Sequence, residues 1–496
     1  MLIWLILVPV IAAALIGLVK APARLTAMAS ATFTLIMGLW AVISTTLCED
    51  CASCACWSTF AGHDLQFTLS LPLSRIMLTL SVLVTFGAIL GLKAPNKEAE
   101  RSWSISALLL STGAIGAFMS DNIISFYAFH ELALIPTFVM IGFYGRGDRR
   151  TIGWTATIYL GLASMVLLAG LLLLCSQMGA WSFTAMKAAV AAGTVPTGCM
   201  TAGLLLAGFG TLVSLFPFHS WAAPAYASAP TPIAMLHAGV LKKFGLYGLF
   251  TLAWAFGPAC AEFFGCWNNV LLVLLLGNVL WVGYVTVAQT RLDDMLGNSS
   301  VMHMGYIFLA FAAYVALGGD NELAFKGAAV LMLAHGLTIA LLFLLNGQIE
   351  SQTRTLEMDS MGGLANKLPW LGFLFGLAGL ASIGLPLLAN FAGEFTVFVS
   401  CFQGWSWGEP QFECGMLNTI SGWFGGLGPV QLATVFALWG LVISAVYMLR
   451  AFRRIFEGET GLASERATGL SCTDKLAAAF LALFIVVFGI FPFIVL

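Results

Sequence analysis

The chain has 496 residues, of which 60% are hydrophobic and 9% are charged, and its mean hydropathy is +0.95. Soluble domains carry about 25% charged residues, so 21 basic and 23 acidic side chains could not cover a soluble body of this size. This composition and the net charge of −2 exclude a cytosolic enzyme, a nucleic-acid-binding protein and a disordered chain, and they indicate an all-α polytopic membrane protein.

Apolar stretches long enough to cross a bilayer recur along the whole sequence. A hydrocarbon core of ~30 Å needs roughly 20 apolar residues in a helix, and these stretches lack the alternation of a barrel strand. We predict about 14 transmembrane helices, at residues 2–20, 25–46, 72–92, 104–119, 123–144, 152–176, 197–218, 230–257, 268–289, 296–316, 323–346, 369–400, 428–449 and 475–496.

The few basic residues define the predicted topology. No basic residue precedes the first span and Lys20 follows it, so we interpret it as a retained helix that starts outside rather than as a cleaved signal. With this start, 16 Lys and Arg residues fall in inner segments and only Arg75, Lys187 and Lys326 fall outside. The positive-inside rule therefore places both termini on the outer, periplasmic side of a bacterial inner membrane.

We expect one membrane domain over residues 1–496. Its predicted parts are three N-terminal helices in 1–103 with a Cys-rich outer loop at 47–71, a first repeat at 104–257, a second repeat at 268–449, and a C-terminal helix at 475–496.

Ten of the 11 cysteines map to the predicted outer side. Disulfides persist in oxidising compartments such as a periplasm, so we predict bridges within 48–56 and the pairs Cys260–Cys266 and Cys401–Cys414. An iron–sulfur cluster at Cys48, Cys51, Cys54 and Cys56 is the alternative, although the spacing is not that of a ferredoxin.

Ionisable residues within apolar stretches are functional candidates because charge at membrane depth is costly. Glu131, preceded by His130, lies in the middle of the span 123–144. Such a carboxylate must be protonated or paired with a cation on another helix. A pair that only fixes helix packing is the alternative to a transport role.

Lys242 and Lys243 lie within the span 230–257. Adjacent helical positions are about 100° apart, so the two side chains cannot share one face. One is expected to face the protein axis and the other a neighbouring helix or a hydrated cavity. A desolvated lysine is suited to carrying a proton.

Two histidines, His303 and His335, stand in apolar stretches of neighbouring spans. A lone buried histidine is usually a core residue, but two histidines between a lysine and a glutamate favour a proton relay. His219 and His237 are weaker candidates.

Glu394 follows a Gly-Leu-Pro sequence at residues 384–386, and prolines also interrupt residues 216–232. Interrupted helices at membrane depth line cavities. These two interruptions, in the seventh and twelfth predicted spans, fit a pair of inverted five-helix repeats, spans 4–8 and 9–13, with two half-channels that face opposite sides.

The sequence contains no phosphate-binding loop, no dinucleotide-binding glycine motif and no C-x-x-C-H haem motif. We therefore expect no cofactor in this chain and no covalent catalysis. Work on a solute must then draw on a partner or on an existing gradient.

Several segments resemble the antiporter-like subunits of respiratory complex I, the proton-pumping NADH–quinone oxidoreductase, subunit M in particular. They are Phe126–Pro136, His219–Trp221, Ala229–Thr231, Ala238–Lys243, Ser300–Gly305, Ala334–Leu337 and Asn390–Phe395. The resemblance covers most of the chain and keeps the order of the motifs. It also extends to the Mrp antiporters, the related superfamily.

The resemblance implies a polar axis for proton transfer along the membrane midplane. Glu131 looks like the carboxylate coupled to a neighbouring lysine, Lys243 like the central lysine, and Glu394 like the terminal carboxylate. His303 and His335 match polar positions between them. The implied partners are antiporter-like neighbours and a long lateral helix from a neighbouring subunit, and flavin, iron–sulfur clusters and quinone belong to partner subunits.

One departure bears directly on this axis. The family usually has a lysine where this chain has Leu212, so Glu131 lacks its usual ionic partner. We hypothesise that Lys242 supplies the missing cation.

Three main functions are compatible with the sequence, and we expect the first; a carrier of bicarbonate or another solute on a related fold is a more distant alternative. The first is a proton-translocating subunit of a redox-driven complex. The second is a subunit of an Mrp-type cation/proton antiporter, with either H⁺ or Na⁺ as the ion. The third, motivated by Leu212, is a structural membrane-arm subunit with impaired pumping.

Overall fold

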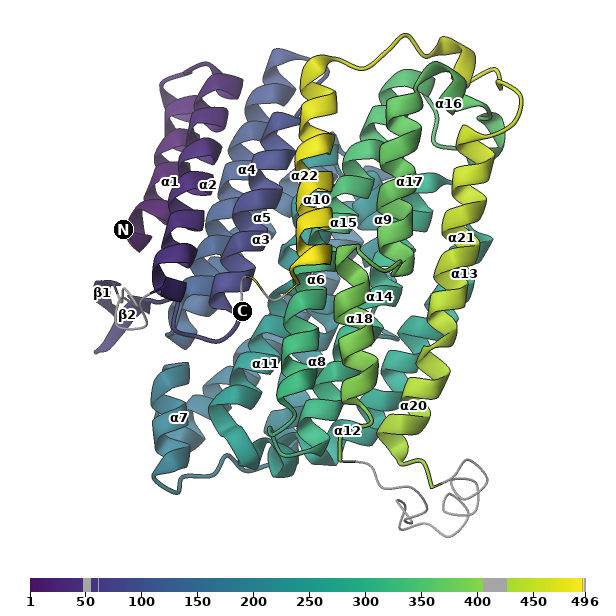
Figure 1. Ribbon diagram of the computed structural model, residues 1–496. Coiled ribbons are helices and arrows are strands. Elements are labelled where there is room, and N and C mark those ends of the chain that lie inside the picture. Colours follow the sequence, from purple (N-terminus) through teal and green to yellow (C-terminus); the bar gives the residue numbers. More distant parts are fainter. Residues whose placement is uncertain (48–54, 61, 405–425, 493, 495–496) are drawn as a thin grey trace.

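The computed structural model describes the whole chain except residues 48–54, 61, 405–425, 493 and 495–496. The described residues are almost all helical, and their helices run side by side in one bundle (Figure 1). In this part of the chain, nine helical stretches are long and apolar enough to cross a membrane, and four shorter apolar helices accompany them. The predicted all-α membrane class is confirmed, whereas the number of spans stays a prediction.

Polar caps begin several helices of the first half. The side chains of Asn96, Asn122 and Asp148 accept hydrogen bonds from backbone N–H groups in the first turns of α4, α5 and α6. The helices of this half are α1 Leu2–Leu18, α2 Ala23–Leu47, α3 Ser74–Leu90, α4 Lys97–Met119, α5 Ile123–Tyr144, α6 Arg149–Met178, α7 Phe183–Ala191, α8 Cys199–Val213, α9 Ala222–Ser228, α10 Thr231–Gly239 and α11 Phe244–Phe256.

The second half is built around α15, whose 32 residues include a membrane-length window that is wholly buried. Its helices are α12 Cys260–Leu276, α13 Gly283–Ala288, α14 Leu292–Ala316, α15 Glu322–Thr353, α16 Leu364–Lys367, α17 Pro369–Ile383, α18 Ala389–Ser400, α20 Pro429–Ala437, α21 Trp439–Phe456 and α22 Cys472–Ile490. A π-helical segment, Gly277–Val282, joins α12 to α13, and short 3-10 turns lie at Leu241–Lys243, Gly257–Ala259, Met358–Ser360 and Ser464–Arg466.

Two helical spans are interrupted where the sequence predicted it. Helix α8 ends at Ser214, whose φ is 68°, and α17 ends at Gly384, whose φ is 82°. A left-handed residue followed by proline ends a helix, and Pro217 and Pro386 follow here. The chain then continues as α9 and α18.

Asn278, fully buried in the π-helical segment, satisfies backbone groups at the first interruption. Its side chain accepts a hydrogen bond from Phe216 N at 2.7 Å and donates one to Ser214 O at 3.0 Å. It donates another to Val301 O at 3.0 Å in α14. Backbone groups freed within a membrane require such partners. The Asn278 amide therefore links the break after α8 to the π-helical segment and to α14.

The segment between α2 and α3 contains a hairpin that the sequence analysis did not predict. Strands β1 Ala55–Phe60 and β2 His63–Phe67 pair antiparallel at the start of the segment that leads into α3. The predicted Cys-rich loop is therefore partly a small sheet.

The cysteine pairing corrects two predictions. Cys199 forms a disulfide with Cys266, joining α8 to α12, whereas Cys260 and Cys401 are buried free thiols. Residues six apart on one helix point to different faces, which explains why Cys260 does not pair with Cys266. The predicted bridges within 48–56, and Cys414, concern side chains outside the described part.

The C-terminal helix α22 returns to the N-terminal part of the bundle. Figure 1 shows it between the first helices and the group formed by α15, α17 and α18. Phe480 in α22 packs against Phe86 in α3, with ring centroids 4.8 Å apart, and Leu481 lies against Gly87. The last helix thus connects the two ends of the chain.

Candidate functional site

Two glycines let α10 cross α15 at very short range. A Cβ atom on Gly239 would lie 3.0 Å from Gly336 O, and one on Gly336 would lie 2.7 Å from Gly239 O. Any larger residue would push the helices apart, so the crossing requires glycine on both sides. It places the segment that carries His237 and the two lysines against the turn of α15 that carries His335.

Both lysines are buried in the 3-10 turn after α10, with exposed fractions of 1% for Lys242 and 0% for Lys243. Lys242 Nζ donates to Ser300 Oγ on α14 at 3.3 Å and lies 5.2 Å from the centre of the Tyr226 ring. Lys243 Nζ turns back and donates to Ala238 O at 2.6 Å. As their adjacent positions imply, the two amines have different partners.

Ser300 connects the lysine to a pair of histidines. Its Oγ lies 3.3 Å from His335 Nε2, and the ring of His335 stacks on that of His303 with centroids 5.2 Å apart. His303 Nδ1 lies 2.9 Å from Ser299 O, and its Nε2 lies 3.0 Å from Ser382 O at the end of α17. All of these side chains are buried.

Glu394 in α18 ends this series. Its Oε1 lies 3.8 Å from His303 Nε2 and has no hydrogen-bond partner among the described residues. A Cβ atom on Gly384 would collide with the Glu394 carboxylate, so the glycine at the break of α17 leaves room for this acid. One turn earlier in α18, Asn390 accepts a hydrogen bond from Thr338 Oγ1 at 3.0 Å, which ties α18 to α15.

His237 lies at the other end of the series, in an aromatic pocket. Its ring centroid is 5.3 Å from that of Tyr226 and 5.8 Å from that of Trp221, and its Nδ1 has no hydrogen-bond partner among the described residues. Tyr226 also faces Lys242, so one ring contacts both groups. His219 lies apart, stacked on Phe216 in the break after α8.

We call the six side chains of His237, Lys242, Ser300, His335, His303 and Glu394 the central series. They come from α10, the turn after it, α14, α15 and α18, so helices from both halves of the chain contribute. Each member can donate or accept a proton. In the described part of the chain, the central series included, no three His, Cys, Asp or Glu side chains gather in a way that could hold a metal ion.

Glu131 lies outside the central series. Its side chain on α5 is 38% exposed, accepts a short hydrogen bond from Ser164 Oγ on α6, and lies 3.5 Å from His130 Nδ1. Tyr127 also bonds to Ser164. The His130 ring stacks on Phe244 with centroids 4.3 Å apart, so an aromatic residue stands between Glu131 and the lysine turn.

The hypothesis that Lys242 pairs with Glu131 is wrong for this structure. The two form no ion pair among the described residues, because Lys242 points to Ser300 on α14 while Glu131 faces α6. Leu212 is a buried core residue of α8. Glu131 therefore has histidine, serine and tyrosine as neighbours rather than a lysine.

Sequence reasoning missed Ser300 in the central series and two uncharged residues that support its surroundings, Tyr226 and Asn278. Ser300, Tyr226 and Asn278 are buried polar residues within apolar helices. An amide such as Asn278 at the centre of the span 268–289 is a usable signal, because buried amides need partners. A serine gives no comparable signal, since serine is common in membrane helices.

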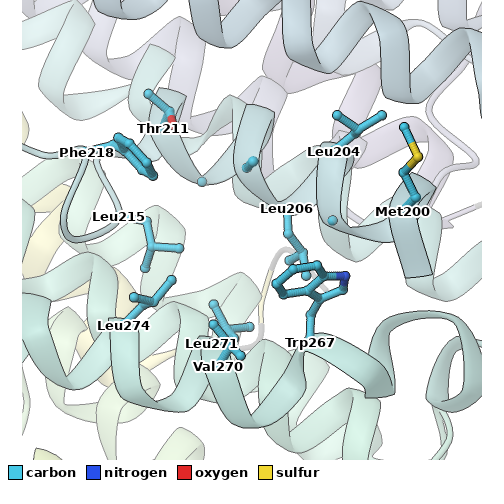
Figure 2. A pocket seen from close by; sticks show the side chains of 13 residues that line it. Met200, Leu204, Leu206, Thr211, Leu215, Phe218, Trp267, Val270, Leu271 and Leu274 are labelled. Carbon is cyan, nitrogen blue, oxygen red and sulfur yellow. The ribbon is translucent and has the colours of Figure 1, made fainter.

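An apolar groove lies beside the first interruption (Figure 2). It holds about 370 Å³ between α8 and α12, and its lining includes Met200 and Trp267, which directly follow the two cysteines of the disulfide. Leu204, Leu271 and Leu274 line it with the rings of Phe218 and Trp267. It contains none of the ionisable groups described above.

A family model described as NADH:quinone oxidoreductase/Mrp antiporter, transmembrane, matches residues 120–410, which is more than half of the chain. The chain belongs to this family. The matched range includes Glu131 and the whole central series.

Individual relatives agree with this assignment. The chain is 30% identical to NAD(P)H-quinone oxidoreductase chain 4 of Synechococcus sp. over 88% of its own length and 76% of that protein. It is 27% identical to NADH-quinone oxidoreductase subunit M of Rickettsia prowazekii over 83% of its length and 77% of that protein.

Solved structures share the fold. A chain of respiratory complex I from Thermus thermophilus superposes with a TM-score of 0.83 at 24% identity, covering 99% of this chain and 96% of that one. A chain of the Mrp complex from Dietzia sp. gives 0.78 at 18% identity, covering 99% and 94%.

Proposed function

We propose that the chain is a proton-translocating, antiporter-like membrane subunit of a respiratory NADH–quinone oxidoreductase complex. The central series is the observation that carries this proposal. A buried path of titratable side chains through apolar helices is costly to build, and transfer of protons along it explains why this chain contains one. The similarity to subunit M and chain 4 proteins supports the setting.

Proton transfer would proceed between neighbouring side chains, and only the two steps through Ser300 are within hydrogen-bond reach as the structure stands. Lys242 exchanges a proton with His335 through the Ser300 hydroxyl, using two contacts of 3.3 Å. His335 and His303 are stacked, and His303 lies 3.8 Å from the Glu394 carboxylate. Imidazole can accept on one nitrogen and donate from the other. Because both nitrogens of His303 face backbone carbonyls, of Ser299 and Ser382, its ring must turn away from one of them to accept a proton.

Lys243 and Glu131 do not carry the proton along this path. We propose that their charges influence where the proton resides. Lys243 is buried next to Lys242, and two adjacent amines in an apolar interior repel each other when both are charged. Glu131 is half-buried beside His130 on α5, where a neighbouring subunit could reach it. We propose that a change of charge at Glu131 is transmitted through His130 to the turn that carries the lysines. There it changes whether Lys242 holds its proton or passes it to Ser300.

The energy must come from partner subunits. Moving one charge against 100 mV costs ~2.3 kcal/mol, so flavin, iron–sulfur clusters and quinone in the partners would supply the driving reaction. The proposed partners are antiporter-like neighbours and a lateral helix from a neighbouring subunit, and no redox group is assigned to this chain.

We propose the predicted topology for this setting, with both termini on the periplasmic side. Two ion pairs support the part of it that places these loops on one common side: Arg146 with Glu350 at 2.7 Å and Arg454 with Asp359 at 2.7 Å. A residue in the left-handed backbone conformation ends a helix in each proposed repeat, Ser214 in 104–257 and Gly384 in 268–449. This correspondence supports the proposed pair of inverted repeats.

The test is proton translocation by the whole complex in inverted membrane vesicles, measured per electron from NADH. We expect Glu394→Gln and Lys242→Met to lower the number of protons per electron while NADH oxidation continues. Glu322→Gln is the matched control, because Glu322 is an exposed acid paired with Lys326 at the start of α15. Unchanged proton yield in both site variants would refute the transport role.

The fold shared with the Mrp complex favours one second candidate, a cation/proton antiporter subunit. It predicts Na⁺/H⁺ exchange in vesicles without any electron donor. Leu212, where relatives of this type are expected to carry a lysine, favours a third, structural role, which predicts normal proton yield in every variant of the central series.

A further inference from the structure

A basic cavity lies at one end of the bundle, away from the central series. It holds about 700 Å³ between the turn that joins α1 to α2 and the first turns of α4. Four cations line it: Lys20 and Arg24 from the α1–α2 turn, and Lys97 and Arg101 from α4. We call these four residues the basic cluster.

The basic cluster leaves the cavity lining with an excess of positive charge, because four cations stand against one acid, Glu100. None of its members forms an ion pair within 4.0 Å in the described part of the chain, although Glu100 also lines the cavity. Lys20, Arg24 and Lys97 are exposed and line the cavity. Like charges that line one cavity repel one another, and a bound anion would lower this repulsion.

Two long helices point their N-termini at the same cavity. Helix α2 begins at Ala23 and α4 begins at Lys97, and both flank the cavity. A helix N-terminus carries about half a positive charge and free N–H donors, which favour phosphate and other anions. The Asn96 side chain caps only Ala99 N, at 2.8 Å. Helix ends and side chains therefore attract the same kind of ligand.

Exposed apolar side chains surround the basic cluster. Leu18, Val19 and Leu25 are 85%, 70% and 71% exposed, and they lie at the ends of α1 and α2 that adjoin the cavity. Such residues next to cations are typical of the boundary between hydrocarbon and headgroups. Figure 1 shows the α1–α2 turn at the end of the bundle, on its outer flank.

We infer that the basic cluster binds the phosphate headgroup of an anionic phospholipid, with its acyl chains along the exposed apolar residues of α1 and α2. Four cations and two helix N-termini provide the charge for the phosphate, and Leu18, Val19 and Leu25 provide the contact for the chains. A free anion would use only the positive charge and would leave the exposed apolar residues without a ligand. The site does not depend on proton transfer, so the two proposals can fail separately.

The test measures lipid binding to the full-length chain, purified in mild detergent with any subunits that accompany it, by native mass spectrometry. The probes are dioleoylphosphatidylglycerol, dioleoylphosphatidylcholine and inorganic phosphate. The variants are Lys97→Gln/Arg101→Gln and Lys20→Gln/Arg24→Gln. The matched control is Arg466→Gln/Lys475→Gln, which removes two exposed cations that do not line the cavity.

We expect the wild type to bind phosphatidylglycerol in preference to phosphatidylcholine. Each double variant should weaken this binding about 30-fold, the effect expected for two interfacial cations, and the control should stay within about twofold of the wild type. Binding by the unaltered chain should also weaken as salt rises, a measurement that does not depend on how the variants fold.

Three results would overturn the inference. The first is unchanged phosphatidylglycerol binding in both site variants. The second is an equal loss in the control pair. The third is competition by inorganic phosphate at the concentration of the lipid, which would show a free-anion site instead of a lipid site.

Discussion

Replacing Ser300 by alanine tests the central series at its one uncharged member. Its hydroxyl is the only group in the described structure that touches both Lys242 Nζ and His335 Nε2, each at 3.3 Å. The substitution leaves the lysine and the histidine in place but beyond hydrogen-bond reach of each other. We expect Ser300→Ala to slow proton translocation without removing any ionisable residue.

The size of the effect follows from the lost contacts. A hydrogen bond to a charged group contributes about 1.5–3 kcal/mol, and each 1.36 kcal/mol is tenfold in rate. The transfer between Lys242 and His335 should therefore slow about 10- to 100-fold. Ser300→Thr keeps the hydroxyl and should retain most of the rate.

The assay is the initial rate of proton uptake by inverted vesicles that contain the complete complex, normalised to NADH oxidation. Ser299→Ala is a closely matched control. Ser299 is the preceding residue of α14, is equally buried, and places its hydroxyl 2.7 Å from that of Tyr447 rather than in the central series. The contact of His303 with Ser299 uses the backbone carbonyl, which alanine preserves.

The reasoning is refuted if Ser300→Ala translocates protons at the rate of the wild type. It is also refuted if Ser299→Ala causes the same loss, because general disturbance of α14 would then explain both variants. Loss of activity in Ser300→Thr together with Ser300→Ala would show that space, rather than the hydroxyl, matters.

Three further predictions concern the supports of the site. Gly336→Ala should force α10 away from α15, destabilise the protein by about 1–3 kcal/mol and lower proton uptake. The control is Gly161→Ala, whose Cβ would meet nothing within 4 Å, and it should change neither stability nor proton uptake. Cys266→Ser removes a bridge across 67 residues and should lower thermal stability in detergent by about 2–4 kcal/mol, whereas substitution of the free Cys260 by alanine should leave the bridge intact. Glu131→Gln should lower the proton yield with little change in unfolding temperature, because this side chain is partly exposed and a Gln oxygen can still accept a hydrogen bond.

Each of these has a contrary outcome. Full proton uptake in Gly336→Ala would show that the helix crossing does not set the contacts of the central series. An unchanged unfolding temperature in Cys266→Ser would show that the bridge does not restrict unfolding. Normal proton yield in Glu131→Gln would remove Glu131 from the mechanism and leave only the central series.

The sequence singled out Lys242, His303, His335 and Glu394, which the structure buries as neighbours, whereas Glu131 and Lys243 lie outside the central series. A charged or imidazole side chain in an apolar stretch is improbable without a function, so Lys242, His335 and Glu394 stood out. The predicted spans coincide with helices because hydropathy reports the length of chain that hydrocarbon can hold. The two interruptions were visible because proline cannot continue a helix.

Contacts between helices could not be predicted in the same way. The link through Ser300 depends on how near α14 comes to the lysine turn, and that distance depends on Gly239 and Gly336 facing each other. The disulfide depends on which helix adjoins α8, and sequence proximity led to the wrong partner for Cys266. Spacing along the chain carries no information on either arrangement.

The position of α22 has a consequence for biosynthesis. Membrane helices enter the bilayer in order as the ribosome makes them, and α3 is finished long before the partner that covers Phe86 and Gly87 exists. Until α22 has been synthesised, that surface of α3 faces lipid or a helper protein. A nonsense mutation just before α22 would leave every ionisable residue of the central series in the chain and yet deprive both α3 and α15 of a neighbouring helix.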